Sequence, residues 1–431
     1  MKVGKEGYIT RLVDRKLSQY LKIFGAVSVE GPKWCGKTWT SLNHANSVSY
    51  IMDPAGNYSN RARAELNPSL VLDGKTPRVI DEWQEAPGIW DAVRFDIDSM
   101  PGFGKYILTG SVTPPRESYK HSGTGRIAII RMRPMTLYES GDSNGTVSLA
   151  NLFSEKKIKP FTADISLPRL IDITIRGGWP QTLYLPVEHA AIISAEYINA
   201  LLKNDLFNNS FSKRNPAKLQ ILLRSLARNN ATTVNETTIA ADIDGENRKG
   251  QSSGDISLSR NSVSQYMADL KRIFVIEEIP GWDPGIRSKT RIRMSPKIVF
   301  ADPSLAVAVM GIGRRRLLED LNTFGFMFEN LCLRDLSAYT EFYGGSLYHY
   351  RDNSNLEVDA IIEIKDGWGA FEIKLGENQI EAAAQTLLRL KNKLVSAGAR
   401  EPSCLGVITG GGLGRKRKDG IYVIPVNALK A

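Results

Sequence analysis

Residues 31–38 have the types and the spacing of a phosphate-binding loop, in which two glycines frame a short turn and a Lys-Thr pair follows the second glycine. The glycines let the backbone curl until several N–H groups point at one phosphate, and a helix that starts near Lys37 adds its positive end. We expect Lys37 to contact the β- and γ-phosphates of ATP and the Thr38 hydroxyl to bind Mg²⁺. The residues expected to bind the nucleotide are Gly31, Pro32, Lys33, Trp34, Cys35, Gly36, Lys37, Thr38 and Trp39.

Two acidic side chains, Asp81 and Glu82, end a predicted strand over 78–82. A nucleotide hydrolase needs one carboxylate at a strand end to hold Mg²⁺ through water and a second one to orient the attacking water. We predict the first role for Asp81 and the second for Glu82; an ordinary solvated strand end is the alternative interpretation. Ser111 follows the next predicted strand, where its hydroxyl is placed to sense the γ-phosphate.

A parallel sheet is expected to position these side chains. Apolar runs that predict strands alternate with helical patterns, which favours a sheet covered by helices on both faces. Ligands bind at the carboxyl ends of the strands in such a sheet, and the candidate residues lie at those ends. The predicted strands cover 26–30, 48–53, 78–82, 105–108 and 126–130, and a helix over 11–22 precedes the first.

The composition is typical of a large globular chain with a basic surface. Its 431 residues are 42% hydrophobic and 24% charged, which suffices for about three domains at roughly 150 residues each. The formal net charge of +10 favours a polyanionic partner such as nucleic acid, with solubility alone as the alternative reason. The three cysteines show neither disulfide nor zinc spacing. Residues 1–26 carry too many charges for a signal peptide and the longest apolar run is too short to span a bilayer, so we expect a cytoplasmic protein without a membrane segment.

The middle of the chain carries the pattern of a DNA-binding module. After a helical region over 192–228, helices are predicted over 237–243 and 259–270 with a polar linker over 244–255 between them, and a strand follows over 273–276. This order resembles a winged helix-turn-helix, whose second helix presents polar side chains to a groove of DNA; a plain packing module is the alternative. The residues expected to contact DNA are Arg260, Asn261, Gln265 and Lys271 on the second helix, and Arg287, Lys289, Arg291 and Arg293, which alternate along a further predicted strand.

In the C-terminal part, an acid on one predicted strand, Asp359, is followed on the next by the Glu-x-Lys pattern of Glu372 and Lys374, and Glu329 lies on a preceding helix. This layout resembles the restriction-endonuclease-like nucleases. The resemblance implies that Asp359, Glu372 and Glu329 bind Mg²⁺, while Lys374 stabilises the attacking water or the charge of the phosphorane. A nuclease fold that has lost its activity is the alternative.

The register of the two strands, predicted over 356–364 and 370–375, decides whether such a site can form. A two-residue turn at Asp366-Gly367 would pair Asp359 with Lys374. Because side chains alternate along a strand, Asp359, Glu372 and Lys374 would then emerge on one face of the hairpin.

Motifs along nearly the whole chain resemble a large prokaryotic family of AAA-type ATPases that join this module to a C-terminal domain of unknown function. The resemblance implies that Lys37, Glu82, Ser111 and Arg126 act in ATP hydrolysis. Arg126 either contacts a γ-phosphate, in its own chain or in a neighbouring one, or forms an ion pair on the surface. The matching motifs are Gly31 to Thr38, Asp81-Glu82-Trp83-Gln84, Leu108-Thr109-Gly110-Ser111, Gly125-Arg126, Gly177-Gly178-Trp179-Pro180, Phe328-Glu329-Asn330, Glu357-Val358-Asp359 and Glu372-Ile373-Lys374.

The sequence therefore predicts an α/β protein with an AAA-type P-loop domain over 1–185, a helical and winged-helix domain over 186–315, and a restriction-endonuclease-like α/β domain over 316–431. The predicted function is that of a DNA-binding, Mg²⁺-dependent ATPase with a metal-dependent nuclease domain, acting on duplex or branched DNA in DNA processing, repair or defence. The alternative is an ATP-controlled binding or signalling protein whose nuclease-like domain is inactive. A homo-oligomer formed through the ATPase domain is compatible with either function.

Overall fold

A computed structural model of the chain describes residues 6–114, 116–154, 159–203, 215–249, 259–285, 294–365 and 367–431. The chain divides into two compact units. Unit 1 comprises Met1–Met135 and Asp269–Val275, and unit 2 comprises Thr136–Ala268 and Ile276–Ala431.

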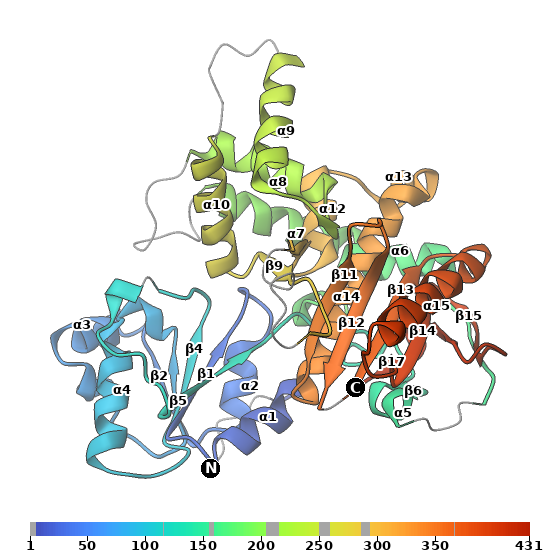
Figure 1. Ribbon diagram of the computed structural model, residues 1–431. Helices are drawn as coiled ribbons and strands as arrows, with labels where there is room; N and C mark the ends of the chain where they lie inside the picture. Colours follow the sequence, from blue (N-terminus) through green and yellow to red (C-terminus); the bar gives the residue numbers. More distant parts are fainter. Residues whose placement is uncertain are drawn as a thin grey trace. The chain divides into compact units, whose positions relative to one another are not determined.

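Unit 1 is built on a parallel sheet of five strands in the order β2-β3-β4-β1-β5, shown in blue to teal in Figure 1. β1 lies between β4 and β5 and all its residues are buried, as an apolar run in the centre of a parallel sheet requires. The predicted parallel sheet is confirmed, with strand ends that differ by up to three residues. The strands are β1 (Ala26–Glu30), β2 (Ser47–Tyr50), β3 (Arg78–Asp81), β4 (Tyr106–Gly110) and β5 (Ile127–Arg131).

The helices of unit 1 bury apolar faces against this sheet. Ile89, Trp90 and Val93 of α4 belong to the same core cluster as Ile80 of β3 and Leu108 of β4. This packing fixes the strands whose carboxyl ends carry the candidate residues. The described helices are α1 (Leu12–Tyr20), α2 (Lys37–Asn43), α3 (Ser59–Leu66) and α4 (Gly88–Ser99), with 3₁₀ turns at η1 (Pro68–Val71), η2 (Trp83–Glu85) and η3 (Arg116–Ser118).

The first part of unit 2 is mainly helical and contains a small antiparallel sheet in the order β8-β10-β9. Two helices, α9 and α10, precede β9 (Figure 1), so the helix-helix-strand order that predicted a winged helix is present, and that identification stays a prediction. The elements are α5 (Leu149–Phe153), α6 (Leu167–Arg176), η4 (Pro180–Thr182), α7 (Val187–Leu202), α8 (Pro216–Arg228), β8 (Thr232–Thr233), α9 (Glu236–Lys249), α10 (Arg260–Arg272), β9 (Ile276–Ile279), β10 (Lys297–Phe300), α12 (Pro303–Met310) and α13 (Arg314–Glu319). The last turn of α10, from Asp269, belongs to unit 1.

Two element boundaries differ from the sequence prediction in this region. Helix α9 continues to Lys249, although a linker was predicted from residue 244. The strand begins at Ile276 instead of residue 273, because Phe274 has a φ of 61° and turns the backbone out of the extended conformation.

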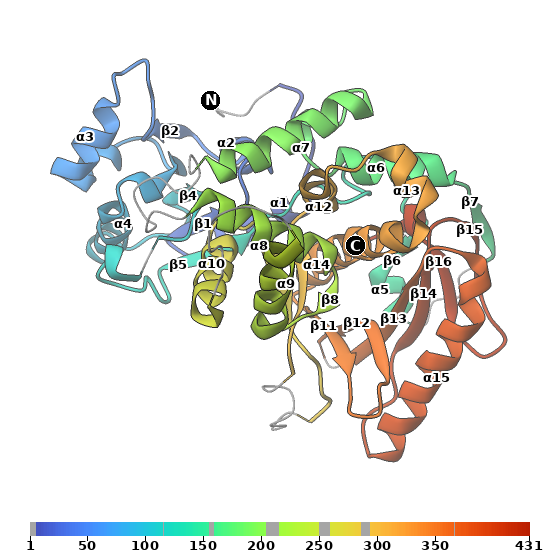
Figure 2. The same cartoon turned by 90° about the horizontal axis from the view of Figure 1, so that it is seen from above.

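The second part of unit 2 is a mixed sheet in the order β11-β12-β13-β14-β16-β15-β7. Helices α14 and α15 cover opposite faces of this sheet (Figure 2). Ala384 and Leu387 of α15 lie in one core cluster with Val358 of β12 and Val407 of β14. The elements are α14 (Leu321–Phe342), β11 (Ser346–Arg351), β12 (Glu357–Ile364), β13 (Gly367–Lys374), η5 (Glu377–Gln379), α15 (Ile380–Ser396), β14 (Cys404–Thr409), β15 (Gly412–Lys416), β16 (Tyr422–Pro425), η6 (Val426–Ala428) and β17 (Leu429–Lys430).

Two short strands place residues 136–185 in unit 2, whereas the sequence prediction assigned them to the first domain, 1–185. β6 (Val147–Ser148) pairs with β17, and β7 (Phe161–Ala163) pairs with β15. The partners are more than 200 residues away along the chain, so no local sequence pattern indicates the pairing. Within the described residues, no helix is long and apolar enough to cross a membrane.

Candidate functional site

The predicted phosphate-binding loop connects β1 to α2 and is tightly curled. Gly36 has a φ of 102°, which favours glycine, and a Cβ on Gly31 would lie 2.1 Å from the Met132 carbonyl oxygen. Lys37 is the first residue of α2, and its Nζ donates to the carbonyl oxygen of Pro32 at 2.8 Å. The lysine ammonium group therefore lies against the loop itself, as the predicted phosphate contact requires.

A buried arginine that the sequence analysis missed holds the outside of this loop. Arg11 Nη1 donates to the carbonyl oxygen of Cys35 at 2.7 Å, and Nη2 donates to that of Arg133 at 2.8 Å. Both acceptors are backbone atoms, so no side-chain motif marks the contact. Arg11 is thus a positioning residue for the loop.

Asp81 joins the loop to the acidic end of β3. Its Oδ1 accepts hydrogen bonds from the hydroxyl of Thr38 at 2.8 Å and from that of Thr109 at 2.7 Å. Burial raises the pKa of Asp81, and the two hydroxyl donors act in the opposite direction. A threonine hydroxyl beside a carboxylate offers oxygen ligands of the kind that Mg²⁺ prefers. These two residues fit the predicted Mg²⁺ position.

Glu82 is held in an unusual backbone conformation beside Asp81. Its φ of 58° and ψ of 48° are left-handed, a region that non-glycine residues rarely adopt and that is enriched at functional sites. Its N–H donates to the Thr109 hydroxyl at 3.0 Å, and its Oε2 accepts from Ser111 at 2.9 Å and from the Gln84 amide. Glu82 and Ser111, which were predicted in separate roles, are therefore in direct contact, with Gln84 as a further partner.

The remaining candidates of unit 1 lie at its surface. Trp34 and Trp39 are 50% and 45% exposed, and Lys33 is half-buried. Arg126 is half-exposed, and its Nε donates to Asp98 at 2.9 Å. The structure thus contains the surface ion pair that was one of the two interpretations for Arg126, and a nucleotide contact by this residue stays a prediction.

The predicted DNA-contacting residues are only partly described. Arg260, Asn261 and Gln265 are exposed on α10, and Arg260 pairs with Glu236 at 3.3 Å. Lys271, on the same helix, is half-buried and belongs to unit 1. Arg287, Lys289, Arg291 and Arg293 lie outside the described residues.

The β12–β13 hairpin brings together the predicted nuclease-like residues. Ile364 pairs with Gly367, so the strand pairing begins one residue earlier than predicted, and Asp366 of the predicted turn lies outside the described residues. This shifts the register by two residues and leaves the alternation of side chains unchanged. Lys374 Nζ lies 2.9 Å from Asp359 Oδ2 and 2.6 Å from Glu372 Oε2.

A second lysine, which the sequence analysis missed, enters the same cluster from β10. Lys297 Nζ lies 2.7 Å from Glu329 Oε1, 3.3 Å from Asp359 Oδ1 and 3.5 Å from Glu357 Oε1. The four carboxyl groups and the two lysines are called the acid cluster below. They are Glu329, Glu357, Asp359, Glu372, Lys297 and Lys374.

Burial and mutual charge divide the carboxyl groups of the acid cluster. Burial and the Asp359 carboxylate raise the pKa of Glu372 to about 8 and that of Glu329 to about 7. Burial also acts to raise the pKa of Asp359, but Lys297 and Lys374 outweigh it and hold this pKa at about 2. Asp359 is therefore the carboxylate that both lysines stabilise in its ionised form.

The acid cluster does not fit the predicted Mg²⁺ site. Mg²⁺ requires oxygen ligands at about 2.0–2.1 Å, and the oxygens of Asp359 are already paired with ammonium groups. No group of three or more His, Cys, Asp or Glu residues in the described ranges is arranged to hold a metal ion. Metal binding by Asp359, Glu372 and Glu329 stays a prediction that this geometry does not favour.

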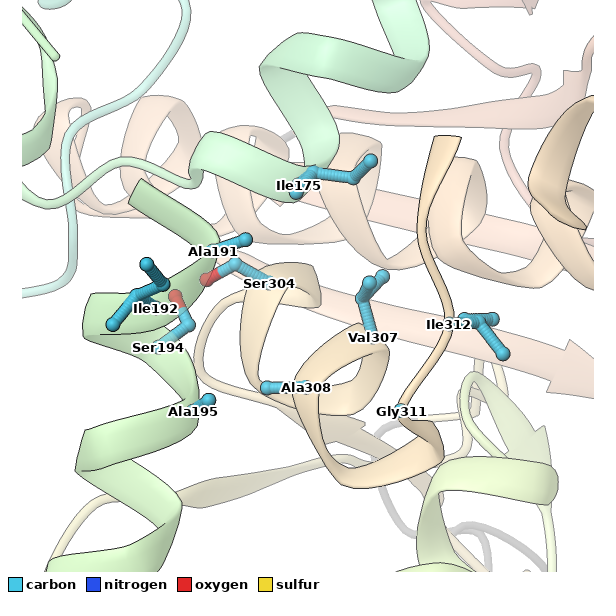
Figure 3. A pocket seen from close by; sticks show the side chains of 10 residues that line it. All are labelled: Ile175, Ala191, Ile192, Ser194, Ala195, Ser304, Val307, Ala308, Gly311 and Ile312. Carbon is cyan, nitrogen blue, oxygen red and sulfur yellow. The ribbon is translucent and has the colours of Figure 1, made fainter. Parts of the chain in front are cut away.

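A cavity of about 270 Å³ lies elsewhere in unit 2, between α7 and α12 (Figure 3). The side chains around it are small or apolar, and none of them titrates. They are Ile175, Ala191, Ile192, Ser194, Ala195, Ser304, Val307, Ala308, Gly311 and Ile312. The cavity therefore offers no catalytic group.

Three family models match successive parts of the chain. Residues 24–140 match an AAA domain, residues 167–316 match a domain of unknown function (DUF8612), and residues 324–429 match another domain of unknown function (DUF4143). Uncharacterized proteins of Mycobacterium bovis and Mycobacterium tuberculosis are each 24% identical over 352 residues, which cover 81% of this chain and 70% of theirs. A Walker-type ATPase of Pyrococcus abyssi has a TM-score of 0.42 at 14% identity, over 72% of this chain and 98% of that one.

The AAA match coincides with the part of the chain that carries the curled loop, the acidic end of β3 and Ser111. The other two matches carry no described activity, so they leave the function of unit 2 open. The N-terminal part of the chain is thus similar to an AAA domain, and its parallel sheet carries the curled loop between β1 and α2.

Proposed function

We propose that the chain is a Mg²⁺-dependent ATP hydrolase that binds DNA. One observation carries the hydrolase proposal: Asp81 Oδ1 accepts from both Thr38 and Thr109, which joins the phosphate-binding loop to the acidic strand end. Nucleotide hydrolysis requires these two parts side by side, because the loop holds the phosphates and the acids act on the metal and on the water.

Each residue of the site then has a definite task. Thr38 and Asp81 would hold Mg²⁺, which offsets the negative charge that develops on the phosphates. Lys37 would leave the Pro32 carbonyl oxygen and bind the β- and γ-phosphates. Glu82 orients the attacking water, and the hydroxyl of Ser111 holds the Glu82 carboxylate in place.

Replacing the loop lysine tests the proposal. Lys37→Ala should abolish Mg²⁺-dependent ATP binding and hydrolysis, because the charge that meets the β- and γ-phosphates is removed. Lys75→Ala removes an exposed lysine of the same unit and should hydrolyse ATP like the parent protein. ATP binding that survives Lys37→Ala unchanged would contradict the proposal.

The DNA-binding part of the proposal is supported by charge and by α10. The chain carries a net charge of +10, and Arg260, Asn261 and Gln265 form an exposed polar face on this helix. Contacts of this kind are made mainly to phosphates, so they predict salt-sensitive binding with little sequence preference.

For the C-terminal domain, the geometry favours the alternative function, that of an inactive nuclease-like module. The hairpin of the acid cluster keeps the predicted alternation of side chains, but Lys297 lies between the carboxylates that a metal-dependent nuclease needs. We therefore propose that ATP turnover in unit 1 is the chemical activity of the chain and that the C-terminal domain serves in binding.

A further inference from the structure

Lys297 Nζ lies at the point on which three carboxylates of the acid cluster converge. This atom is within 3.5 Å of oxygens from Glu329, Glu357 and Asp359. These oxygens come from the middle of α14 and from β12, so they converge on one point from two elements. The Lys297 side chain is only 2% exposed, which makes its ammonium group an internal part of the fold.

Both oxygens of the Asp359 carboxylate already accept from donors. Lys297 faces Oδ1, while Oδ2 accepts from Lys374 and from the N–H of Ile373, each at 2.9 Å. A metal ion bound to Asp359 would compete with these donors. It would also lie close to a buried ammonium group, where like charges repel strongly in a low dielectric.

The charges of the cluster require a cation at this point. Four carboxylates and two ammonium groups leave a charge of −2 if every group is ionised. Arg351 offsets part of this charge, since its Nη1 lies 4.0 Å from Glu357 Oε2. His349 does not contribute, because burial and the charge of Lys297 lower its pKa to about 4 and keep it neutral.

We propose that the Lys297 ammonium group takes the position of a divalent metal ion in the acid cluster. It keeps metal ions out of the native C-terminal domain, and its removal leaves a divalent-cation site. Because Lys297 lies at the start of β10, outside the hairpin and α14, its ammonium group also links the small sheet to the C-terminal domain.

The proposal is tested by measuring how much Mn²⁺ the nucleotide-free full chain binds. The electron paramagnetic resonance signal of free Mn²⁺ reports the amount that remains unbound. The parent protein and Asp359→Asn should bind the same amount of Mn²⁺, because the acid cluster holds none. Lys297→Met should bind one additional ion per chain, since three carboxylates then surround the vacated point. Lys297→Met/Asp359→Asn should lose it again. Lys391→Met breaks a surface pair with Glu401 and should resemble the parent protein.

Two results would overturn the proposal. One is Mn²⁺ binding by the parent protein that disappears in Asp359→Asn, because a metal site would then exist beside Lys297. The other is a folded Lys297→Met variant that binds no additional Mn²⁺. If Lys297→Met does not fold, Lys297→Met/Glu329→Gln can replace it, because this variant removes one charge of each sign. It should still bind one more Mn²⁺ ion than the parent protein, and the additional Asp359→Asn replacement should abolish this binding. The comparison of the parent protein with Asp359→Asn shows, without any Lys297 variant, whether the native acid cluster binds a metal ion. Neither result depends on ATP hydrolysis.

Discussion

Replacing Glu372 by glutamine should remove a pH dependence from the stability of unit 2. Glu372 is 4% exposed, and burial together with the Asp359 carboxylate raises its pKa to about 8 from an ordinary value of 4.5. Glutamine has nearly the same shape and can still accept a hydrogen bond from Lys374, but it does not titrate.

The sign and the size of the effect follow from the raised pKa. Below pH 4.5 the carboxyl group is protonated in the folded and the unfolded chain, so its contribution to stability is complete. Between pH 4.5 and about 8 the unfolded chain loses the proton that the folded chain keeps, so the free energy of unfolding falls by about 1 kcal/mol per pH unit. Glu329, whose pKa is about 7, acts in the same direction. Asp359 acts in the opposite direction, but only below its ordinary pKa of 3.8.

Urea denaturation between about pH 5 and about pH 8 measures this slope. Trp282 and Trp368 are buried together in the core of unit 2, so their contribution to the tryptophan fluorescence changes when this unit unfolds. The free energy of unfolding of Glu372→Gln should fall with pH less steeply than that of the parent protein, by about 1 kcal/mol per pH unit. Glu401→Gln, at an exposed acid, should leave the slope unchanged. Equal slopes for Glu372→Gln and the parent protein would refute a raised pKa at this position.

Two further predictions concern DNA binding and the core of unit 2. Replacing Arg287, Lys289, Arg291 and Arg293 together by alanine, or Arg260 alone, should weaken the salt dependence of DNA affinity. The log–log slope of affinity against salt should fall by ~0.9 for each DNA phosphate that is no longer neutralised. Fluorescence anisotropy measures this slope, with Lys418→Ala as the control, and an unchanged slope would exclude these residues as DNA contacts. Arg334 is fully buried with both Asp302 and Asp335 at 2.7 Å, so Arg334→Met should destabilise unit 2 by about 3–5 kcal/mol in urea denaturation, and a destabilisation below about 1 kcal/mol would contradict an essential ion network.

The parts of the site that lie in short stretches of sequence could be predicted. The loop, the two acids of β3 and Ser111 are each marked by a local pattern, and the parallel sheet brings them to one edge. The face shared by Asp359, Glu372 and Lys374 was predicted correctly although the turn was not. Lys365 takes a φ of 54°, which moves the turn by one residue, and the alternation of side chains tolerates a register shift of two.

The parts that depend on distant contacts could not be predicted. Lys297 lies 32 residues before Glu329 and 62 before Asp359, and nothing in its own segment marks it as a partner of the hairpin. The Arg11 guanidinium group reaches the loop through a backbone oxygen, that of Cys35. Such contacts depend on the tertiary fold, and a single sequence gives no signal for them.

The most direct test of the account is to separate ATP binding from ATP turnover at Glu82. ATP binding and phosphate release are measured on Glu82→Gln, with Glu85→Gln as a control that changes a neighbouring acid in the same way. Glu82→Gln should bind ATP with Mg²⁺ as tightly as the parent protein, because Lys37, Thr38 and Asp81 are intact, while its turnover falls by roughly 10²-fold or more. Turnover by Glu82→Gln at the rate of the parent protein would contradict the role of Glu82 and the hydrolytic site built around it.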